Sequence, residues 1–427
     1  MKPQKFSRTF SGSLTVFAVM IVFASASFAV TPKETVLHHF KGGSDGAYPE
    51  ASLIEDSAHN LYGTTASGGT SHLGTVFEVS PPGTAWTETV LYSFAGGNDG
   101  AYPYSDLIFD KAGNLYGTTL LGGGPSCYGD LGCGTVFQLA PPATQGAPWT
   151  ETVLYRFTGG SDGGGPFAGL IMDSKGNLYG TTFEGGAFVC RKTRCGTVFE
   201  LSPPITQGGP WTEAVLYSFG KGSDGTHPVG NLAFGLRGAI FGTTSTGRSK
   251  AKYGTVFKLR PPATQGGPWT EEVLYRFTDL SDGGFPSAGL VTDKSGNLYG
   301  TTSAGGPSGD GVVFEISFGT WAETVLYSFT FGSDGGYPLA RLLIDKTGNL
   351  YGTTTFGGIN YNGSAFELSP PTVQGGPWTE TTLYDFAGGH DGSNPNAGLT
   401  FGEGGQLYGT TLHGDTLDEG TVFRIIH

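Results

Sequence analysis

Charged residues are scarce in this 427-residue chain, and positive residues are scarcer than negative ones. They make up 14% of the sequence, with 23 Lys and Arg against 36 Asp and Glu, which gives a net charge of −13. Nucleic-acid binding relies on basic patches that neutralise phosphates, so we expect no nucleic-acid partner. For the same reason we do not expect the chain to bind an anionic membrane surface.

Long hydrophobic runs are nearly absent. The run at residues 14–23 is short for a membrane span, which needs about 20 residues. Basic residues precede it at Lys2, Lys5 and Arg8, and the small-x-small sequence Ser27-Phe28-Ala29 follows it. This order predicts a signal peptide over residues 1–29 and a secreted or periplasmic mature chain with no membrane span. An uncleaved membrane anchor is the alternative.

Helical periodicity is missing as well, and the 75 glycines recur in register instead of forming low-complexity sequence. The string Tyr-Gly-Thr-Thr occurs at 62–65, 116–119, 179–182, 299–302, 351–354 and 408–411, and Phe-Gly-Thr-Thr occurs at 241–244. Gly-Thr-Val-Phe or a variant follows each copy. Val-Leu-Tyr-x-Phe, or a variant of it, also occurs seven times, each time followed by an Asp-Gly pair. The chain is therefore built from seven copies of one unit.

Each unit holds four short apolar runs separated by turn residues. In the third unit the runs are 168–173, 177–182, 196–202 and 211–219. Four antiparallel strands repeated seven times predict an all-β fold, a seven-bladed β-propeller in one domain over residues 30–427. The last unit lacks its fourth run, while residues 34–40 align with 88–94. We therefore expect the N-terminal strand to complete the seventh blade and close the ring.

The repeated strings resemble a known family. Leu-Tyr-x-Phe, Ser-Asp-Gly, Gly-Asn-Leu-Tyr-Gly-Thr-Thr and Gly-Thr-Val-Phe-Glu-Leu-Ser-Pro are similar to the repeats of the bacterial GloVer proteins, also called choice-of-anchor extracellular repeat proteins. The resemblance covers nearly all of residues 34–427. It implies an exported bacterial protein but no particular activity, because the family has no agreed one.

The four cysteines form two close pairs in the same loop of neighbouring units. Export favours disulfides, so we expect local bridges between Cys127 and Cys133 and between Cys190 and Cys195. Bridges between blades and a four-cysteine metal site are the alternatives, although the spacings differ from the tight pairs typical of zinc.

Residues that break the repeat are the candidates for ligand binding. The loop that precedes Gly-Thr-Val-Phe, which holds the cysteines in the second and third units, carries three cations in the third unit and three in the fourth. Because these units form adjacent blades, we expect the six cations to lie close together. They are Arg191, Lys192, Arg194, Arg248, Lys250 and Lys252. Such a basic patch could hold an anionic glycan or the carboxylates of a protein, or it could be solvated loop charge. Asp106 and Arg341 are the only charges among seven positions expected around the central channel. They could bind a small polar group or simply line the channel with water.

Two repeated residue types remain open to more than one interpretation. The seven Asp-Gly aspartates could bind calcium or cap turns. The six tryptophans that open the fourth runs could stack on sugars or pack between blades. No other metal or cofactor is expected, and we see no catalytic set of residues.

These observations favour a monomeric, non-catalytic binding module with an extracellular glycan or protein as ligand. A secreted carbohydrate-active enzyme, either a glycoside hydrolase or a lyase, is one alternative. A purely structural envelope or matrix protein is the other.

Overall fold

The computed structural model describes residue 1 and residues 32–427 apart from 82–84, 125–126, 128–130, 145, 191–192, 207, 265 and 374. Met1–Thr31 and Pro32–His427 form separate units, and only the second is considered below. The predicted signal peptide therefore lies outside the described residues, Met1 excepted. Within those residues, no helix is long and apolar enough to span a membrane.

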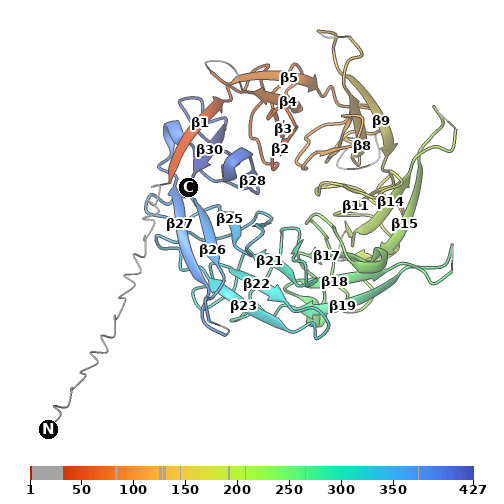
Figure 1. The fold of residues 1–427 in the computed structure, drawn as a ribbon. Coiled ribbons are helices and arrows are strands. Elements are labelled where there is room, and N and C mark those ends of the chain that lie inside the picture. The colour runs from red at the N-terminus through yellow and green to blue at the C-terminus, as the bar shows by residue number, and fades with distance from the viewer. Residues whose placement is uncertain are drawn as a thin grey trace. The chain divides into compact units, whose positions relative to one another are not determined.

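Seven four-stranded antiparallel sheets form the blades of a ring (Figure 1). Blade 1 contains β2 (Ile54–Glu55), β3 (Leu61–Thr65), β4 (Thr75–Ser80) and β5 (Thr87–Ser93), and blade 2 contains β6 (Ile108–Phe109), β7 (Leu115–Thr119), β8 (Thr135–Ala140) and β9 (Thr150–Arg156). Blade 3 contains β10 (Ile171–Met172), β11 (Leu178–Thr182), β14 (Thr197–Ser202) and β15 (Thr212–Ser218), and blade 4 contains β16 (Ala233–Phe234), β17 (Ile240–Thr244), β18 (Thr255–Arg260) and β19 (Thr270–Arg276). Blade 5 contains β20 (Val291–Thr292), β21 (Leu298–Thr302), β22 (Val312–Ile316) and β23 (Glu323–Ser328), and blade 6 contains β24 (Leu343–Ile344), β25 (Leu350–Thr354), β26 (Ser364–Ser369) and β27 (Thr379–Asp385). The predicted seven-bladed propeller is confirmed.

Blade 7 joins the two ends of the described unit. It contains β28 (Thr400–Phe401), β29 (Leu407–Thr411), β30 (Thr421–Ile426) and, as its outermost strand, β1 (Lys33–His39). β1 pairs antiparallel with β30, with Lys33 opposite Ile426 and His39 opposite Thr421. Figure 1 shows β1 in red beside the blue β30. The predicted closure of the ring by the N-terminal strand is confirmed.

The second strand of each blade is fully buried, and its glycine explains how closely the strands pack. In β11 every residue is buried. A Cβ atom added to Gly180 would lie 2.6 Å from Cζ of Phe199 on the neighbouring strand. Only glycine leaves room for this ring, which is itself buried and packs edge-on against Phe157 at a centroid distance of 5.1 Å.

The innermost strands are shorter than expected. β10 contains two residues, whereas the sequence predicted a run over 168–173. The first part of this run bonds to the neighbouring blade instead of to a strand of its own, because the Ala168 carbonyl accepts a hydrogen bond from Thr118 Oγ1 at 3.2 Å. These residues therefore join blades 2 and 3.

Strand direction assigns the loops to two faces. We call the face that carries the seven Asp-Gly pairs and the loops between the second and third strands the aspartate face. We call the opposite face, which carries the turns between the two inner strands and the connections to the outermost strands, the hairpin face. A small hairpin, β12 (Val189–Cys190) with β13 (Thr193–Arg194), and the 3-10 helices η2 (Ser249–Ala251) and η3 (Gly389–Asp391) lie in aspartate-face loops. The 3-10 helices η1 (Leu236–Gly238) and η4 (Glu403–Gly405) replace hairpin-face turns in blades 4 and 7.

Candidate functional site

The cysteines form the two local disulfides that the sequence predicted. Cys127 is bonded to Cys133 with a Cα–Cα distance of 5.0 Å, and Cys190 to Cys195 with a Cα–Cα distance of 5.3 Å. Each bridge closes one aspartate-face loop. Such bonds persist in oxidising compartments, which fits an extracellular or periplasmic protein.

The Asp-Gly aspartates hold their own loops in place. Asp162 is typical: Oδ2 accepts hydrogen bonds from the Tyr155 hydroxyl at 3.2 Å and from the Thr158 amide at 2.8 Å. Six units have this tyrosine contact, and in the first unit His38 takes the place of the tyrosine, with Nε2 3.6 Å from Asp45. These contacts correspond to the turn-capping interpretation of the aspartates.

The basic loops of blades 3 and 4 do come together. Arg191 and Lys192 lie outside the described residues. Arg194 donates to the Gly186 carbonyl, and Arg248 reaches the next blade to donate to the Val189 carbonyl at 2.6 Å. Two of the predicted cations thus bond to the backbone of one loop.

The other two described cations of these loops lie on blade 4. Nζ of Lys252 lies 4.6 Å from the centroid of the Tyr253 ring and donates to its hydroxyl at 2.9 Å. Lys250 is exposed in η2. Three of the four described cations in the two loops therefore have intramolecular partners.

A small cavity of about 120 Å³ lies among the inner strands, and all seven predicted channel positions, including Arg341, line it. Asp106 is fully engaged there: Oδ1 accepts from the Ser52 amide at 2.7 Å and Oδ2 from Asn231 Nδ2 at 2.6 Å. Asn231 Oδ1 in turn accepts from the Gly169 amide at 2.7 Å. These bonds link blades 1, 2, 3 and 4 around the channel, so Asp106 has a structural role.

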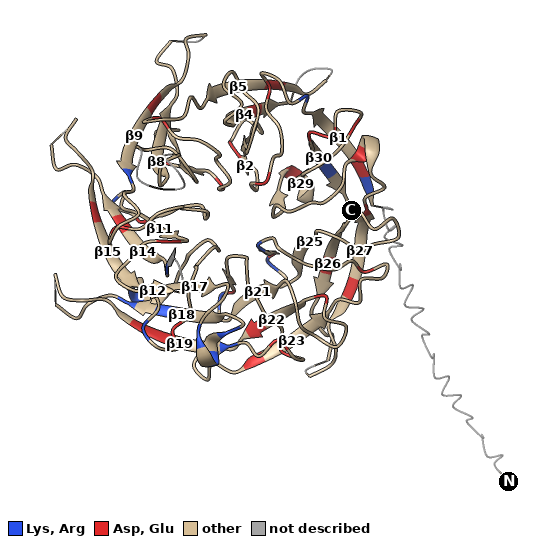
Figure 2. Cartoon of the chain, turned by 180° about the vertical axis from the view of Figure 1, so that it is seen from behind, with Lys and Arg blue, Asp and Glu red and all other residues tan. Residues whose placement is uncertain are grey.

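Glu50 also lines this cavity, and sequence reasoning did not select it. Burial raises its pKa to about 7. A raised carboxyl pKa can mark an acid–base site. Here it is not distinctive, because burial raises the pKa of Glu88, Glu151 and Glu213 in the outermost strands to about 7 as well. Figure 2 shows red acidic residues on the outermost strands β9, β15, β19 and β27.

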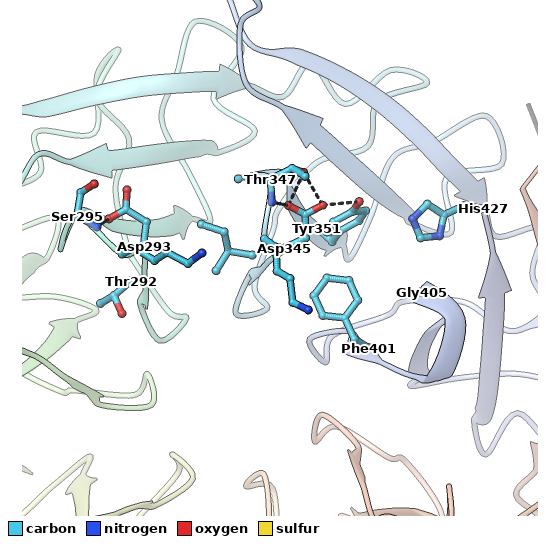
Figure 3. A pocket seen from close by; sticks show the side chains of 13 residues that line it. Thr292, Asp293, Ser295, Asp345, Thr347, Tyr351, Phe401, Gly405 and His427 are labelled. Carbon is cyan, nitrogen blue, oxygen red and sulfur yellow. Dashed lines mark hydrogen bonds between the residues drawn. The ribbon is translucent and has the colours of Figure 1, made fainter. Parts of the chain in front are cut away.

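A second cavity, of about 860 Å³, opens on the hairpin face between blades 5, 6 and 7. Tyr351, Phe401 and His427 line one side, and Thr292 and Asp293 lie across from them (Figure 3). The Tyr351 ring meets the rings of Phe401 and His427 edge-on, each at a centroid distance of 5.4 Å. Its volume suits a ligand of several hundred daltons.

This cavity lies where the repeat of tryptophans is interrupted. Five of the six tryptophans pack on the tyrosine or phenylalanine of the preceding blade with centroid distances from 5.9 to 6.4 Å, and Trp269 packs in the cluster that contains Tyr179. The tryptophans thus pack between blades. At blade 7 the matching residue is Pro32, and Tyr351 of blade 6 meets only the smaller rings of Phe401 and His427.

Two further cavities continue this one along the hairpin face. A cavity of about 570 Å³ shares Thr292, Asp293 and Lys294 with it, and one of about 340 Å³ shares Phe234 and Gly235 with the second. We call these three neighbouring cavities, which share lining residues, the hairpin-face groove. It runs from blade 3 to blade 7.

Aromatic, basic and acidic side chains line the groove, and the acidic ones are Asp173, Asp293 and Asp345. Its rings include Phe234 and Phe318, which are 38% and 45% exposed. Its cations are Arg237, Lys258, Lys294 and Lys346. Burial lowers the pKa of Lys258, whose Nζ lies 4.9 Å from the centroid of the Trp321 ring.

Sequence reasoning missed the groove, although a signal was present. The turn between the two inner strands carries a lysine or arginine in five consecutive blades: Lys111, Lys175, Arg237, Lys294 and Lys346. On a chain of net charge −13 this row of cations departs from the average composition. The interruption of the tryptophan repeat at Pro32 was a second signal.

The repeats match a known family over three overlapping stretches, residues 26–186, 89–291 and 237–427. The chain belongs to the Gloeobacter/Verrucomicrobia repeat family. The resemblance to GloVer proteins is thereby confirmed. No curated protein matches the chain.

Solved structures share the propeller fold with this member of the Gloeobacter/Verrucomicrobia repeat family. A predicted 6-phosphogluconolactonase from Bacteroides uniformis has a TM-score of 0.50 and 15% identity, over 82% of this chain and 88% of its own. A second protein with the same predicted activity, from Bacteroides fragilis, has a TM-score of 0.50 and 16% identity, over 82% of this chain and 86% of its own. At such identities the likeness concerns the fold alone.

Proposed function

We propose that the protein is an extracellular, non-catalytic binding module and that its ligand is an acidic polysaccharide bound along the hairpin-face groove. The observation that carries the proposal is the row of aromatic rings and cations in neighbouring cavities, whose three aspartates accept hydrogen bonds within their own turns. The signal-peptide pattern and the two disulfides support an extracellular location.

Aromatic rings and cations together suit a sugar chain with carboxylates. The apolar faces of sugar rings pack on exposed aromatic side chains such as Phe234 and Phe318. Carboxylates along the chain pair with Lys294 and Lys346. A groove over several blades takes several sugar units in a row, whereas the rest of the acidic surface repels the ligand.

The Asp345 carboxylate, which lines the cavity of about 860 Å³, favours binding over catalysis. Burial alone would raise the pKa of Asp345, but hydrogen bonds from Thr347 and Asn349 lower it below the usual value. A carboxylate that is ionised and hydrogen-bonded in this way is poorly suited to donate a proton to a leaving group.

Binding to a polyuronate and to an uncharged polysaccharide, measured by calorimetry, tests the proposal. We expect binding to the polyuronate only, weakened by salt. The double variant Lys294→Glu/Lys346→Glu should bind at least about 10-fold more weakly, because each charged contact contributes roughly 1 kcal/mol. Lys111→Glu/Lys221→Glu is the matched control, since these two exposed lysines do not line the groove, and it should bind normally.

Two results would count against the proposal. Equal loss of binding in both double variants would show that overall charge and not the groove is responsible. Release of new reducing ends from the polyuronate would identify an enzyme instead of a binding module.

A further inference from the structure

Three side chains that are distant in the sequence meet on the aspartate face of blade 7. His39 ends β1, His390 lies in η3, and Asp415 lies in the loop between β29 and β30. One potential ligand atom from each lies within 4.8 Å of those of the others, and no other such group occurs among the residues that the structure describes. The two imidazole rings lie 4.5 Å apart between centroids.

We propose that His39, His390 and Asp415 bind a divalent transition metal ion, with Zn²⁺ as the best match. Two imidazole nitrogens and one carboxylate oxygen are ligands that zinc commonly takes, with one position left for water. Calcium and magnesium prefer oxygen ligands throughout, so this set does not suit them.

The side chains are close to the geometry that zinc needs. Zinc ligand bonds are about 2.0–2.1 Å long, which places tetrahedral ligand atoms roughly 3.4 Å apart. Because no two of the ligand atoms are more than 4.8 Å apart, the side chains must close by at most about 1.4 Å. His390 can make this movement because it is exposed and lies between Gly388, Gly389 and Gly392 in a short turn.

The half-buried His39 supplies a second, independent observation. Its Nδ1 atom is buried and has no hydrogen-bond partner among the described residues. A buried polar atom without a partner carries a desolvation cost, which a metal or another bound group removes. Nε2 of the neighbouring His38 is likewise buried without a hydrogen-bond partner, but a carboxylate oxygen of Asp45 lies 3.6 Å from it. Nδ1 of the exposed His59 bonds to Glu55 at 2.9 Å.

The position of the site indicates what the metal would do. β1 comes from the start of the propeller, whereas η3 and the Asp415 loop come from its end. The three ligands assemble only when β1 has paired with β30. A metal bound there adds its binding free energy to the closed ring, because the open chain does not offer the same site.

Zinc titration of the purified full chain, followed by calorimetry and thermal unfolding, tests the inference. We expect one Zn²⁺ per chain and a Tm increase of at least about 2 °C at saturating zinc. His390→Ala and Asp415→Asn should fold normally, since both residues lie in surface loops, and should lose the increase. His72→Ala removes an exposed histidine elsewhere and should retain it.

Other outcomes would overturn the inference. These are no Tm increase in the unaltered chain, or an equal increase in all four proteins. An increase with Ca²⁺ but not with Zn²⁺ would also overturn it, because it would place an oxygen-preferring cation at the site.

Discussion

Seven glutamates, one near the start of each outermost strand, share a half-buried position. Burial is the main cause that raises the pKa of each to about 7, and the aspartate of a nearby Asp-Gly pair adds to it. The residues are Glu34, Glu88, Glu151, Glu213, Glu271, Glu323 and Glu380. Because the ordinary value is 4.5, the folded chain keeps protons there that the unfolded chain has released. Their contribution to stability is present at low pH and is lost as pH rises through 7.

We therefore expect the Tm to fall between about pH 5 and about pH 8. Burial lowers the pKa of His38 to about 4 and also lowers the pKa of His39, so both act in the opposite direction, but they are two groups against seven. Glu213→Gln should raise the Tm at about pH 8, because the uncharged amide replaces a half-buried carboxylate that is ionised beside Asp162. It should change the Tm little at about pH 5, where Glu213 is itself protonated and uncharged. Calorimetry over this range measures the effect. Glu403→Gln, which alters an exposed carboxylate, is the control. If the plots of Tm against pH for Glu213→Gln and the unaltered chain were parallel, the explanation would be contradicted.

The outermost strand of blade 7 is the element on which ring closure depends. β1 covers the edge of β30 and brings the buried Phe40 against Phe77 of blade 1 at a centroid distance of 5.1 Å. Without it, β30 would present an unpaired edge.

Deleting residues 34–40 should lower the Tm sharply, as measured by thermal unfolding. The deletion also removes the Phe40 contact, so Phe40→Ala serves for comparison. That substitution should cost about 3–5 kcal/mol, as expected for a buried phenylalanine. The deletion should cost more, because it also exposes the β30 edge. An unchanged melting curve after the deletion would contradict closure by β1.

The two disulfide-closed loops are small elements, and their bonds should matter less than the blades. Replacing Cys127 and Cys133 with serine should lower the free energy of unfolding by about 2 kcal/mol at most, because the loop they close is short. Denaturant unfolding of the double variant measures this. A loss comparable to that of Phe40→Ala would show that the bridge supports the core.

The architecture of the whole propeller was readable from the sequence because every blade repeats it. The Tyr-Gly-Thr-Thr string recurs in the buried second strand, where only glycine fits beside the phenylalanine of the next strand. This regularity predicts the number of blades, the order of the strands and the closure of the ring. The short inner strands were not predicted, because contacts such as Thr118 with Ala168 lie between blades and leave no local pattern.

Candidate sites were harder to predict than the fold for a similar reason. Local clusters drew attention to the cations of blades 3 and 4, yet Arg248 bonds to the backbone of Val189. The hairpin-face groove and the group of His39, His390 and Asp415 arise from residues of different blades, and no local string marks them. Comparing the residues at one position of the repeat in all blades can indicate such sites. Pro32, which stands where the other blades have tryptophan, is an example.

The pairing of β1 with β30 also has a kinetic consequence. Among the strands of the propeller, β1 is synthesised first and its partner β30 last, so nearly the whole propeller lies between two strands that must pair. Contacts between distant parts of a chain slow folding and leave strand edges exposed meanwhile. Blades 1 to 6 can form as synthesis proceeds, but blade 7 cannot be completed until β30 has been made. The first strand of the propeller to be made is therefore among the last to be paired.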